Sequence, residues 1–367
     1  MKKIYYIAYS SIPSSLPSSL QIIKTCESLA KNKHDVTLIK PGTGNKNYSI
    51  KKYYDVKESI SIKEFSSIKK FPQGIKFYLY SIYCLLFILK QREPLIITRN
   101  YFVSYLCILF KKKVILELHH DTLIEGRVTR FILKYFNFFN NKNLVNLVAI
   151  SNSVKSLFLK KYNVNEKKIT TLHSGSSIKI NLKPKLVNRK RFKIAYFGSL
   201  SSSKGIDTLI KLSKIDKKND YYIYGGNKDQ IREIRKRNTN NNLFLNSNIP
   251  YKKIPEAMIA MDILTMPYKK TIRSAGEVDD ISKYTSPLKL FDYLAVGKTI
   301  ITSDLKVLRE VIGNKNAYFV KNYQNIYEWK KNIELAKNNR VKNLIISKNN
   351  LNLSKNYHHF KRVEKYI

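Results

Sequence analysis

Short apolar runs that suit β-strands alternate with helical patterns along the whole chain, and this alternation limits the possible folds more than any other feature. In the first half the expected strands are Ile4–Tyr9, Asp35–Ile39, Leu95–Thr98, Val114–Leu118, Leu147–Ile150 and Ile169–Leu172. In the second half they are Phe192–Phe197, Tyr221–Tyr224, Leu243–Leu245, Ile263–Met266, Thr299–Thr302 and Ala317–Val320. Strands separated by helices favour a parallel α/β architecture.

The alternation occurs twice, and a polar, basic stretch at 174–191 without a clear period separates the two rounds. A length of 367 residues suits two domains of ordinary size. We therefore expect two Rossmann-like, doubly wound domains that face a cleft, at 1–180 and 181–350. Residues 351–367 should form a C-terminal helix that packs back toward the first domain. Ligands of such sheets bind at the carboxyl ends of the strands.

The net charge of +42 predicts attraction to polyanions such as nucleic acid, an anionic membrane or phosphate-bearing substrates. Because the basic residues are spread over the whole chain, a general compositional bias explains the charge equally well. Three cysteines lie far apart without metal or redox spacing, which favours a reduced cytosolic setting. The apolar run Ile4 to Ala8 is too short for a signal segment and suits a first strand.

The segment Ile75–Lys90 is strongly apolar and aromatic but too short and too polar for a membrane span. We interpret it as a core helix. The alternative is an interfacial helix that lies on lipid, with Lys70, Lys76 and Lys90 at the head groups. In that case Phe77, Tyr78, Tyr80 and Leu86 should insert.

The stretch Ser286–Lys298 predicts a helix start that suits a phosphate, because free N–H groups and the positive end of the helix dipole point outward there. Thr285 or Ser286 can cap this helix, and Pro287 fits its first position. Asp292 follows about two turns later and could receive ribose hydroxyls. The alternative is an ordinary capped core helix.

A second phosphate signal follows the strand that ends at Phe197. Gly198 lets the backbone turn close to a ligand, and Lys204 precedes a helix, where it can neutralise a phosphate. A solvated lysine is the alternative. Two loops add weaker signals: 269–284 is expected to be a lid over this site, and the serine-rich 10–19 could line an acceptor pocket.

His119, His120 and Asp121 directly follow an expected strand, which is the functional position in a parallel sheet. A histidine there can hold a substrate hydroxyl or transfer a proton, although it can equally cap a loop. The histidines have no metal-site spacing, so we expect no metal. The sequence also has no Walker motif and no serine nucleophile elbow.

Four segments together resemble the GT-B glycosyltransferases of the large glycogen-synthase-like group often called family 4. They are Val148–Val154, Lys168–Gly175, Phe197–Gly205 and, most specifically, Ser286–Gly297. The resemblance implies two Rossmann-like domains, a nucleotide-sugar donor in the second and an acceptor in the first. It also implies transfer with retention and no metal or other cofactor.

The resemblance assigns the donor phosphates to one group of residues. The family's phosphate-binding lysine matches Lys204, whereas its arginine partner is replaced by Ser199 after Gly198. Neutralisation of the phosphates should therefore depend on Lys204 and Lys289. Ser286, Pro287 and Leu288 match the family's backbone cradle for the phosphates, and Thr285 directly before them is expected to bind the donor as well.

The resemblance assigns the rest of the nucleotide-sugar to further residues. The family's two glutamates, eight residues apart, fall on Tyr284 and Asp292, so only the ribose-binding acid is kept. Base contacts fall near Gly225 and Ile249. The histidine near the transferred sugar matches His119, and the resemblance thus gives His119, Lys204 and Asp292 the catalytic roles.

From these patterns we predict a hexosyltransferase-type glycosyltransferase that moves a sugar to a glycan or lipid-linked acceptor in bacterial surface polysaccharide or glycolipid synthesis. It should be cytoplasmic and peripheral at an anionic membrane face, with nucleic acid not expected as a partner. A non-catalytic polyanion-binding or membrane-binding protein of the same fold is one alternative. A sugar-nucleotide epimerase is the other, although no acid/base pair is evident beside the donor segments.

Overall fold

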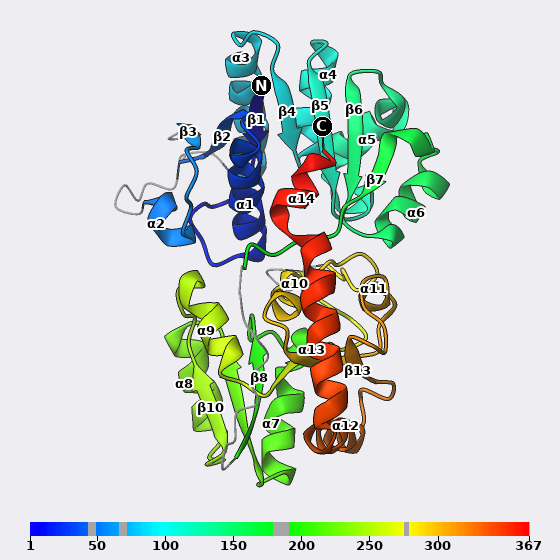
Figure 1. The fold of residues 1–367 in the computed structure, drawn as a ribbon. Coiled ribbons are helices and arrows are strands. Elements are labelled where there is room, and N and C mark those ends of the chain that lie inside the picture. Colours follow the sequence, from blue (N-terminus) through cyan, green and yellow to red (C-terminus); the bar gives the residue numbers. More distant parts are fainter. Residues whose placement is uncertain (43–48, 66–71, 179–190, 275–278, 367) are drawn as a thin grey trace. The chain divides into compact units, whose positions relative to one another are not determined.

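The chain forms two compact units in a computed structural model that describes residues 1–42, 49–65, 72–178, 191–274 and 279–366 (Figure 1). Unit 1 contains Met1–Ser174 together with His359–Ile367, and unit 2 contains Gly175–His358. The change of unit therefore occurs between Ser174 and Gly175, and the chain returns to unit 1 at His359. Most of the expected linker, at 179–190, lies outside the described residues.

Unit 1 is built on a parallel seven-stranded sheet in the order β3-β2-β1-β4-β5-β6-β7. The strands are β1 Lys3–Ile7, β2 Asp35–Pro41, β3 Ser61–Phe65, β4 Leu95–Thr98, β5 Lys113–Leu118, β6 Leu144–Ala149 and β7 Ile169–Thr171. The helices are α1 Pro17–Lys31, α2 Ile50–Tyr54, α3 Gln73–Leu89, α4 Tyr101–Leu109, α5 Arg127–Tyr135, α6 Asn152–Lys161 and α14 His359–Glu364, with short 3₁₀ turns η1 Thr122–Ile124, η2 Phe138–Asn140 and η3 Glu166–Lys168. The strand order reverses between β1 and β4, as in a doubly wound sheet.

Unit 2 repeats this plan with a parallel six-stranded sheet in the order β10-β9-β8-β11-β12-β13. The strands are β8 Phe192–Phe197, β9 Asn219–Tyr224, β10 Leu243–Asn246, β11 Ile263–Met266, β12 Thr299–Ser303 and β13 Ala317–Val320. The helices are α7 Ile206–Ile215, α8 Lys228–Lys236, α9 Ile254–Ile259, α10 Leu288–Ala295, α11 Lys306–Arg309, α12 Ile326–Asn338 and α13 Arg340–Ser354, with 3₁₀ turns η4 Ser202–Lys204, η5 Tyr251–Lys253 and η6 Lys355–Tyr357. Here the order reverses between β8 and β11.

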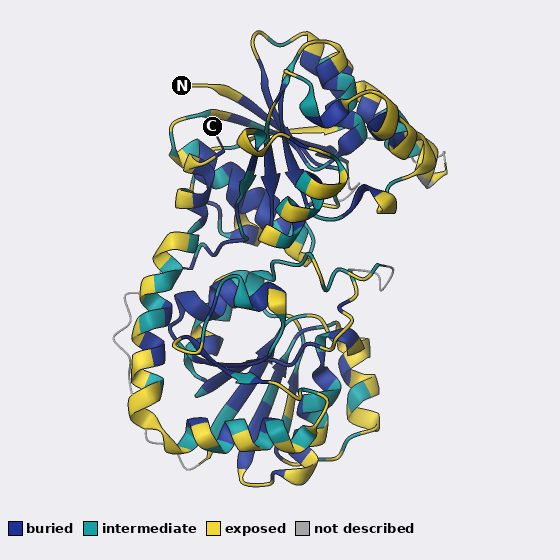
Figure 2. Ribbon diagram, turned by 90° about the vertical axis from the view of Figure 1, so that its right-hand side faces the viewer, coloured by how far each residue is buried: buried dark blue, intermediate teal, exposed yellow. Residues whose placement is uncertain are grey.

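In each unit the central strands are buried, and most helices expose one face (Figure 2). All strands expected from the sequence are present, and the α/β, doubly wound class is confirmed. Strand β3 was not predicted, because four of its five residues are exposed and its sequence, SIKEF, lacks an apolar run. It is the edge strand of unit 1 and pairs with β2 alone, and edge strands tolerate such polar composition.

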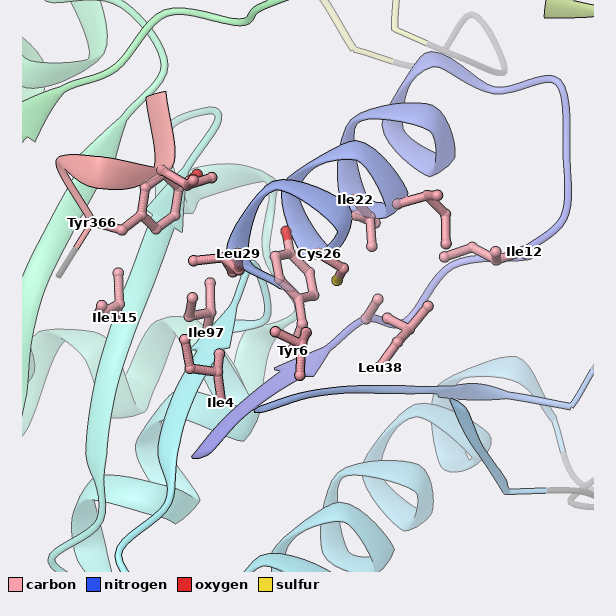
Figure 3. Packing of buried hydrophobic residues seen from close by; sticks show 14 of the residues in the cluster. Ile4, Tyr6, Ile12, Ile22, Cys26, Leu29, Leu38, Ile97, Ile115 and Tyr366 are labelled. Carbon is pink, nitrogen blue, oxygen red and sulfur yellow. The ribbon is translucent and has the colours of Figure 1, made fainter. Parts of the chain in front are cut away.

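The last residues of the chain complete the core of unit 1. Helix α14 packs beside α1, and Tyr366 lies on the same side of the sheet as Tyr6 and the α1 residues Cys26 and Leu29 (Figure 3). Tyr366 is only 2% exposed. Burial of a whole tyrosine stabilises a fold by a few kcal/mol, at about 25 cal/mol per Å² of apolar surface. The C-terminal segment is therefore part of this unit's core.

Helix α10 begins one position later than the sequence indicated. Leu288 is its first residue, and Pro287 occupies the cap position in an extended conformation. The prediction that Pro287 is the first helical residue is therefore wrong by one place. Pro287 does not cap through its side chain, but its carbonyl oxygen accepts a 3.0 Å hydrogen bond from the Leu290 amide in this first turn.

Helix α3 combines a buried face with an exposed apolar face. Tyr80 is 2% exposed, and its hydroxyl donates to the carbonyl oxygens of Ala8 and Ile39. The expectation that Tyr80 projects into lipid is therefore wrong, whereas Phe77 is half-buried and packs against Tyr9 and Phe102, so its insertion stays a prediction. Leu86 is exposed, as expected. No helix of the described residues is long and apolar enough to cross a membrane.

Candidate functional site

The strand order of unit 2 reverses where β8 and β11 lie side by side, and the loops after these strands carry most of the sequence-predicted donor residues. Gly198 follows β8 with a φ of +148°, and Gly225 follows β9 with a φ of +155°. A Cβ atom on Gly225 would lie 1.7 Å from the carbonyl oxygen of Gly198. Gly225 therefore requires glycine because the two loops approach backbone to backbone there, and the positive φ of Gly198 favours glycine at that position as well.

Lys289 reaches over the end of β8 from the first turn of α10. Its ammonium nitrogen lies 3.8 Å from the centre of the Tyr196 ring and 5.4 Å from the centre of the Tyr268 ring. A Cβ atom on Gly198 would lie 2.4 Å from this nitrogen. The absence of a side chain at Gly198 therefore leaves the space that Lys289 occupies.

Lys204, the last residue of η4, also approaches the Tyr268 ring. Its ammonium nitrogen lies 5.7 Å from the centre of the Tyr268 ring and donates a 2.8 Å hydrogen bond to the carbonyl oxygen of Arg273. Gly205 follows with a φ of +78°, and a Cβ there would meet the carbonyl oxygen of Pro267 at 1.6 Å. This close packing of η4 on the loop after β11 fixes the base of the Lys204 side chain.

The two lysines influence each other electrostatically. Burial lowers the pKa of Lys289 well below its usual range, and the Lys204 charge lowers it further. Two lysine side chains that approach one tyrosine ring form a favourable site for an anion with several negative oxygens, because such an anion favours the charged form of both amines. A diphosphate has this chemistry, and the positive end of the α10 dipole lies at the same helix start.

The remaining predicted phosphate residues lie on the approach to α10. The amides of Tyr284 and Thr285 donate to the carbonyl oxygen of Ile281, which forms a turn before the helix. Ser286 and Leu288, which follow this turn, are both half-buried. The backbone of Tyr284, Thr285, Ser286 and Leu288 therefore leads directly into the first turn of α10, where Lys289 lies.

Ser199 itself supplies no charge. Its side chain is exposed, and its carbonyl oxygen accepts a hydrogen bond from the Tyr196 hydroxyl at 2.8 Å. This bond orients the ring on which Lys289 rests. The two residues predicted near the base lie on adjacent loops, with Gly225 buried after β9 and Ile249 half-buried after β10.

Asp292 is directed toward a neighbouring loop of unit 2. Its carboxylate accepts a 2.6 Å hydrogen bond from the Ser176 hydroxyl, and the residue is 8% exposed. Burial raises the pKa of Asp292 to about 7, although the bond from Ser176 opposes the rise. Asp292 therefore belongs to a polar pair at α10, and its predicted role toward ribose stays a prediction.

His119 lies in unit 1, just after β5, and its partner is Glu117 on the same strand. The histidine Nε2 atom is 3.3 Å from Glu117 Oε2. Burial lowers the pKa of His119 to about 4, and the nearby Arg99 charge adds to this. His119 is therefore a neutral imidazole at physiological pH.

The neighbours of His119 have structural partners. The Asp121 carboxylate accepts from Lys161 at 2.7 Å and from the Tyr162 hydroxyl, which ties the β5 loop to α6. His120 lies 3.0 Å from the Asp121 carbonyl oxygen through Nδ1. The serine-rich loop is likewise internally bonded, with the hydroxyls of Ser14 and Ser19 only 2.7 Å apart.

Several residues that shape these sites were not predicted. Tyr196 and Tyr268 hold the lysines, Ser176 holds Asp292, and Glu117 holds His119. Glu117 carried a readable signal, because residues two apart in a strand project on the same face. The others belong to separate segments, and only the fold brings them together.

Comparison with known families matches almost the whole chain. Residues 177–362 match the family model described as Glycosyl transferases group 1, and residues 20–178 match the model described as Glycosyltransferase Family 4. The first match alone covers half of the sequence. No match was found among curated proteins.

Solved structures resemble the chain over its full length. HepE from Anabaena, in complex with UDP and glucose, gives a TM-score of 0.72 at 14% identity and covers 100% of this chain and 98% of that chain. A glycosyltransferase from Rickettsia africae gives a TM-score of 0.73 at 18% identity, and the match covers 99% of this chain and 96% of that chain. WaaG, a glycosyltransferase involved in lipopolysaccharide biosynthesis, gives a TM-score of 0.65 at 12% identity, and the match covers 99% of this chain and 98% of that chain. These similarities confirm the predicted GT-B fold.

Proposed function

This chain belongs to the glycosyl transferases of group 1, and we propose that it transfers a hexose from a nucleotide-sugar to a glycan or lipid-linked acceptor with retention of configuration. The observation that carries this proposal is the pair of ammonium groups, Lys204 and Lys289, that meet at Tyr268 beside Gly198. Paired cations at the switch point of a parallel sheet suit the diphosphate of such a donor.

The same pair supports the chemical step. When the sugar leaves, negative charge grows on the departing phosphate, and cations already in place stabilise it without reorganisation. Lys204 and Lys289 would bind the diphosphate together with the first-turn amides of α10. Asp292 would accept the ribose hydroxyls, for which it must exchange or share its bond from Ser176. His119 would contact the transferred sugar, as the family resemblance implies.

UDP-sugars are the first donors to test, because HepE was crystallised with UDP and with UDP-glucose. Calorimetric titration with UDP, UDP-glucose and GDP-sugars should show binding that Lys204→Ala and Lys289→Ala each weaken. Lys211, an exposed lysine of α7, provides the control Lys211→Ala. If this protein binds none of these nucleotides, the result favours the alternative that it is a non-catalytic member of the fold. Conversion of the donor sugar without an acceptor would indicate the epimerase alternative.

We also propose that unit 1 associates peripherally with the cytoplasmic face of an anionic bacterial membrane, where lipid-linked acceptors of surface polysaccharide or glycolipid synthesis lie. Helix α5 favours this. Its side chains Val128, Phe131 and Tyr135 are each more than half exposed at a spacing of three and four residues. Arg127 and Arg130 are exposed on the same helix. Aromatic and basic residues together suit an interfacial helix on anionic lipid.

A further inference from the structure

Glu117 of β5 is a fully buried carboxylate that receives hydrogen bonds from several parts of unit 1. Its Oε2 atom accepts from Arg99 Nε at 2.6 Å and from the Tyr6 hydroxyl at 3.0 Å. Its Oε1 atom accepts from the Tyr366 hydroxyl and lies 3.7 Å from Arg362 Nη1. Burial alone would raise the pKa of Glu117, but Arg99, His119 and Arg362 together hold it well below its usual range.

His119 uses this carboxylate as its only described side-chain partner. An ionised carboxylate can only accept, so the His119 Nε2 atom, 3.3 Å from Glu117 Oε2, carries the hydrogen. The imidazole is neutral, and its Nδ1 atom therefore bears a lone pair. About a fifth of the His119 side chain is exposed. A substrate hydroxyl that reaches this lone pair can donate a hydrogen bond to it.

The two carboxylate oxygens have different partners. Among the described residues, Oε2 contacts Tyr6 of β1, Arg99 just after β4, and His119, whereas Oε1 contacts Tyr366 and Arg362 near the C-terminus. The carboxylate is rigid and planar, so a rotation about its bond to the side chain moves both oxygens together. Contacts that hold Oε1 therefore also fix the position of Oε2. Arg362 is itself anchored through Nε to the carbonyl oxygen of His173 at 2.9 Å.

We propose that Glu117 is a positioning residue for His119, and that Tyr366 and Arg362 of the C-terminal segment hold Glu117 in that position. The segment thereby fixes the His119 tautomer that offers Nδ1 as a hydrogen-bond acceptor to a hydroxyl of a sugar substrate. The substrate part of this inference depends on the proposed function, but the tautomer part does not. The groups that act on the imidazole are Glu117, Arg99 and His120.

The tautomer can be measured without any substrate. Nitrogen-15 and carbon-13 correlation spectra of histidine-labelled full-length protein at neutral pH should show His119 as the neutral tautomer with hydrogen on Nε2. Glu117→Gln and Tyr366→Phe should each shift the population toward the other tautomer. Tyr80→Phe is the matched control, because Tyr80 is also buried in unit 1 and bonded through its hydroxyl, but to backbone oxygens.

Kinetics provide the second measurement. Tyr366→Phe should lower kcat by about tenfold, the cost of one lost buried hydrogen bond, with the donor KM unchanged. In a His119→Ala background Tyr366→Phe should have no further effect on kcat, because both changes act through one imidazole.

An unchanged His119 tautomer in Tyr366→Phe would overturn the proposal, even if Glu117→Gln fails to fold. Additive losses of kcat in the double variant would overturn it too. If the wild-type protein transfers no sugar from any donor, the proposed function fails, while the spectra still decide whether Glu117 positions His119.

Discussion

The ammonium nitrogen of Lys289 lies 3.8 Å from the centre of the Tyr196 ring, on the ring face. This contact replaces part of the hydration that the ammonium loses on burial, because the aromatic face carries partial negative charge. Within the described residues no acidic side chain forms an ion pair with Lys289. Lys289 is therefore stabilised by an aromatic ring rather than by a carboxylate of the described residues.

This arrangement predicts that nucleotide binding takes up protons. Burial and Lys204 lower the pKa of Lys289, so part of the free protein carries a neutral amine there as pH rises. A bound diphosphate favours the charged form and raises that pKa, so protons are absorbed and affinity falls as pH increases. Calorimetric titrations with UDP in buffers of different ionisation enthalpy measure the uptake.

The control for proton uptake is Lys289→Arg, because arginine stays charged throughout this range. This variant should bind UDP with less proton uptake than wild type. Equal uptake in both proteins would assign the titrating group elsewhere.

Lys204→Ala should lower turnover more than it lowers donor affinity. The charge on the leaving phosphate is greater in the transition state than in the bound donor, so a cation contributes more there. Ser199 offers no replacement cation beside Gly198. Steady-state kinetics and calorimetry on the same preparation measure both quantities, with Lys211→Ala as the control. If kcat and affinity are both unchanged, the cation comes from another residue, and Lys289 is the first to test.

Asp292→Ala should weaken nucleotide-sugar binding by about 1–3 kcal/mol, because ribose hydroxyls lose a charged acceptor. Asp229→Ala, on the exposed surface of α8, serves as the control. Calorimetry with the free nucleoside diphosphate and the intact donor should show the loss in both, since both carry the ribose. Equal affinities in the variant and wild type would place Asp292 outside the donor site.

The raised pKa of Asp292 also predicts that the free energy of unfolding depends on pH. Burial raises the pKa of Asp292 from 3.8 to about 7, so between these values the folded state holds more protons than the unfolded state. Its contribution to stability is therefore present at low pH and is lost as pH rises through about 7, by up to about 4 kcal/mol. Asp292→Asn should remove this loss, so its melting temperature relative to wild type should increase from acidic to basic pH. A constant difference would contradict the raised pKa.

The sequence predicted the repeating units of this fold better than its polar contacts. Runs such as Phe192–Phe197 are apolar and bounded by turn residues, so local pattern is sufficient to identify them. The partners of Glu117 lie on β1, just after β4 and near the C-terminus, as far as 249 residues away in sequence. No local period encodes such a contact. Lys289 was predicted from the family resemblance, whereas its support by Tyr196 and Tyr268 depends on how α10 packs at the switch point.

The final prediction concerns helix α5 and anionic lipid. Each basic residue near such a surface contributes about 1 kcal/mol, and screening limits its reach to about 8 Å at physiological salt. Binding of the full-length protein to anionic vesicles should fall as salt rises, leaving a salt-resistant fraction that reflects insertion of Phe131 and Tyr135. Co-sedimentation across a salt series measures both parts.

The double variant Phe131→Ser with Tyr135→Ser should lose the salt-resistant fraction and keep the salt-sensitive one, because it removes apolar surface without changing charge. The matched control is Val341→Ser with Ile345→Ser on α13 of unit 2, where both side chains are also more than half exposed. If both double variants bind like wild type, α5 is not the lipid-binding surface. If the wild-type protein does not bind anionic vesicles even at low salt, the peripheral association is wrong, and the charge of +42 reflects composition alone.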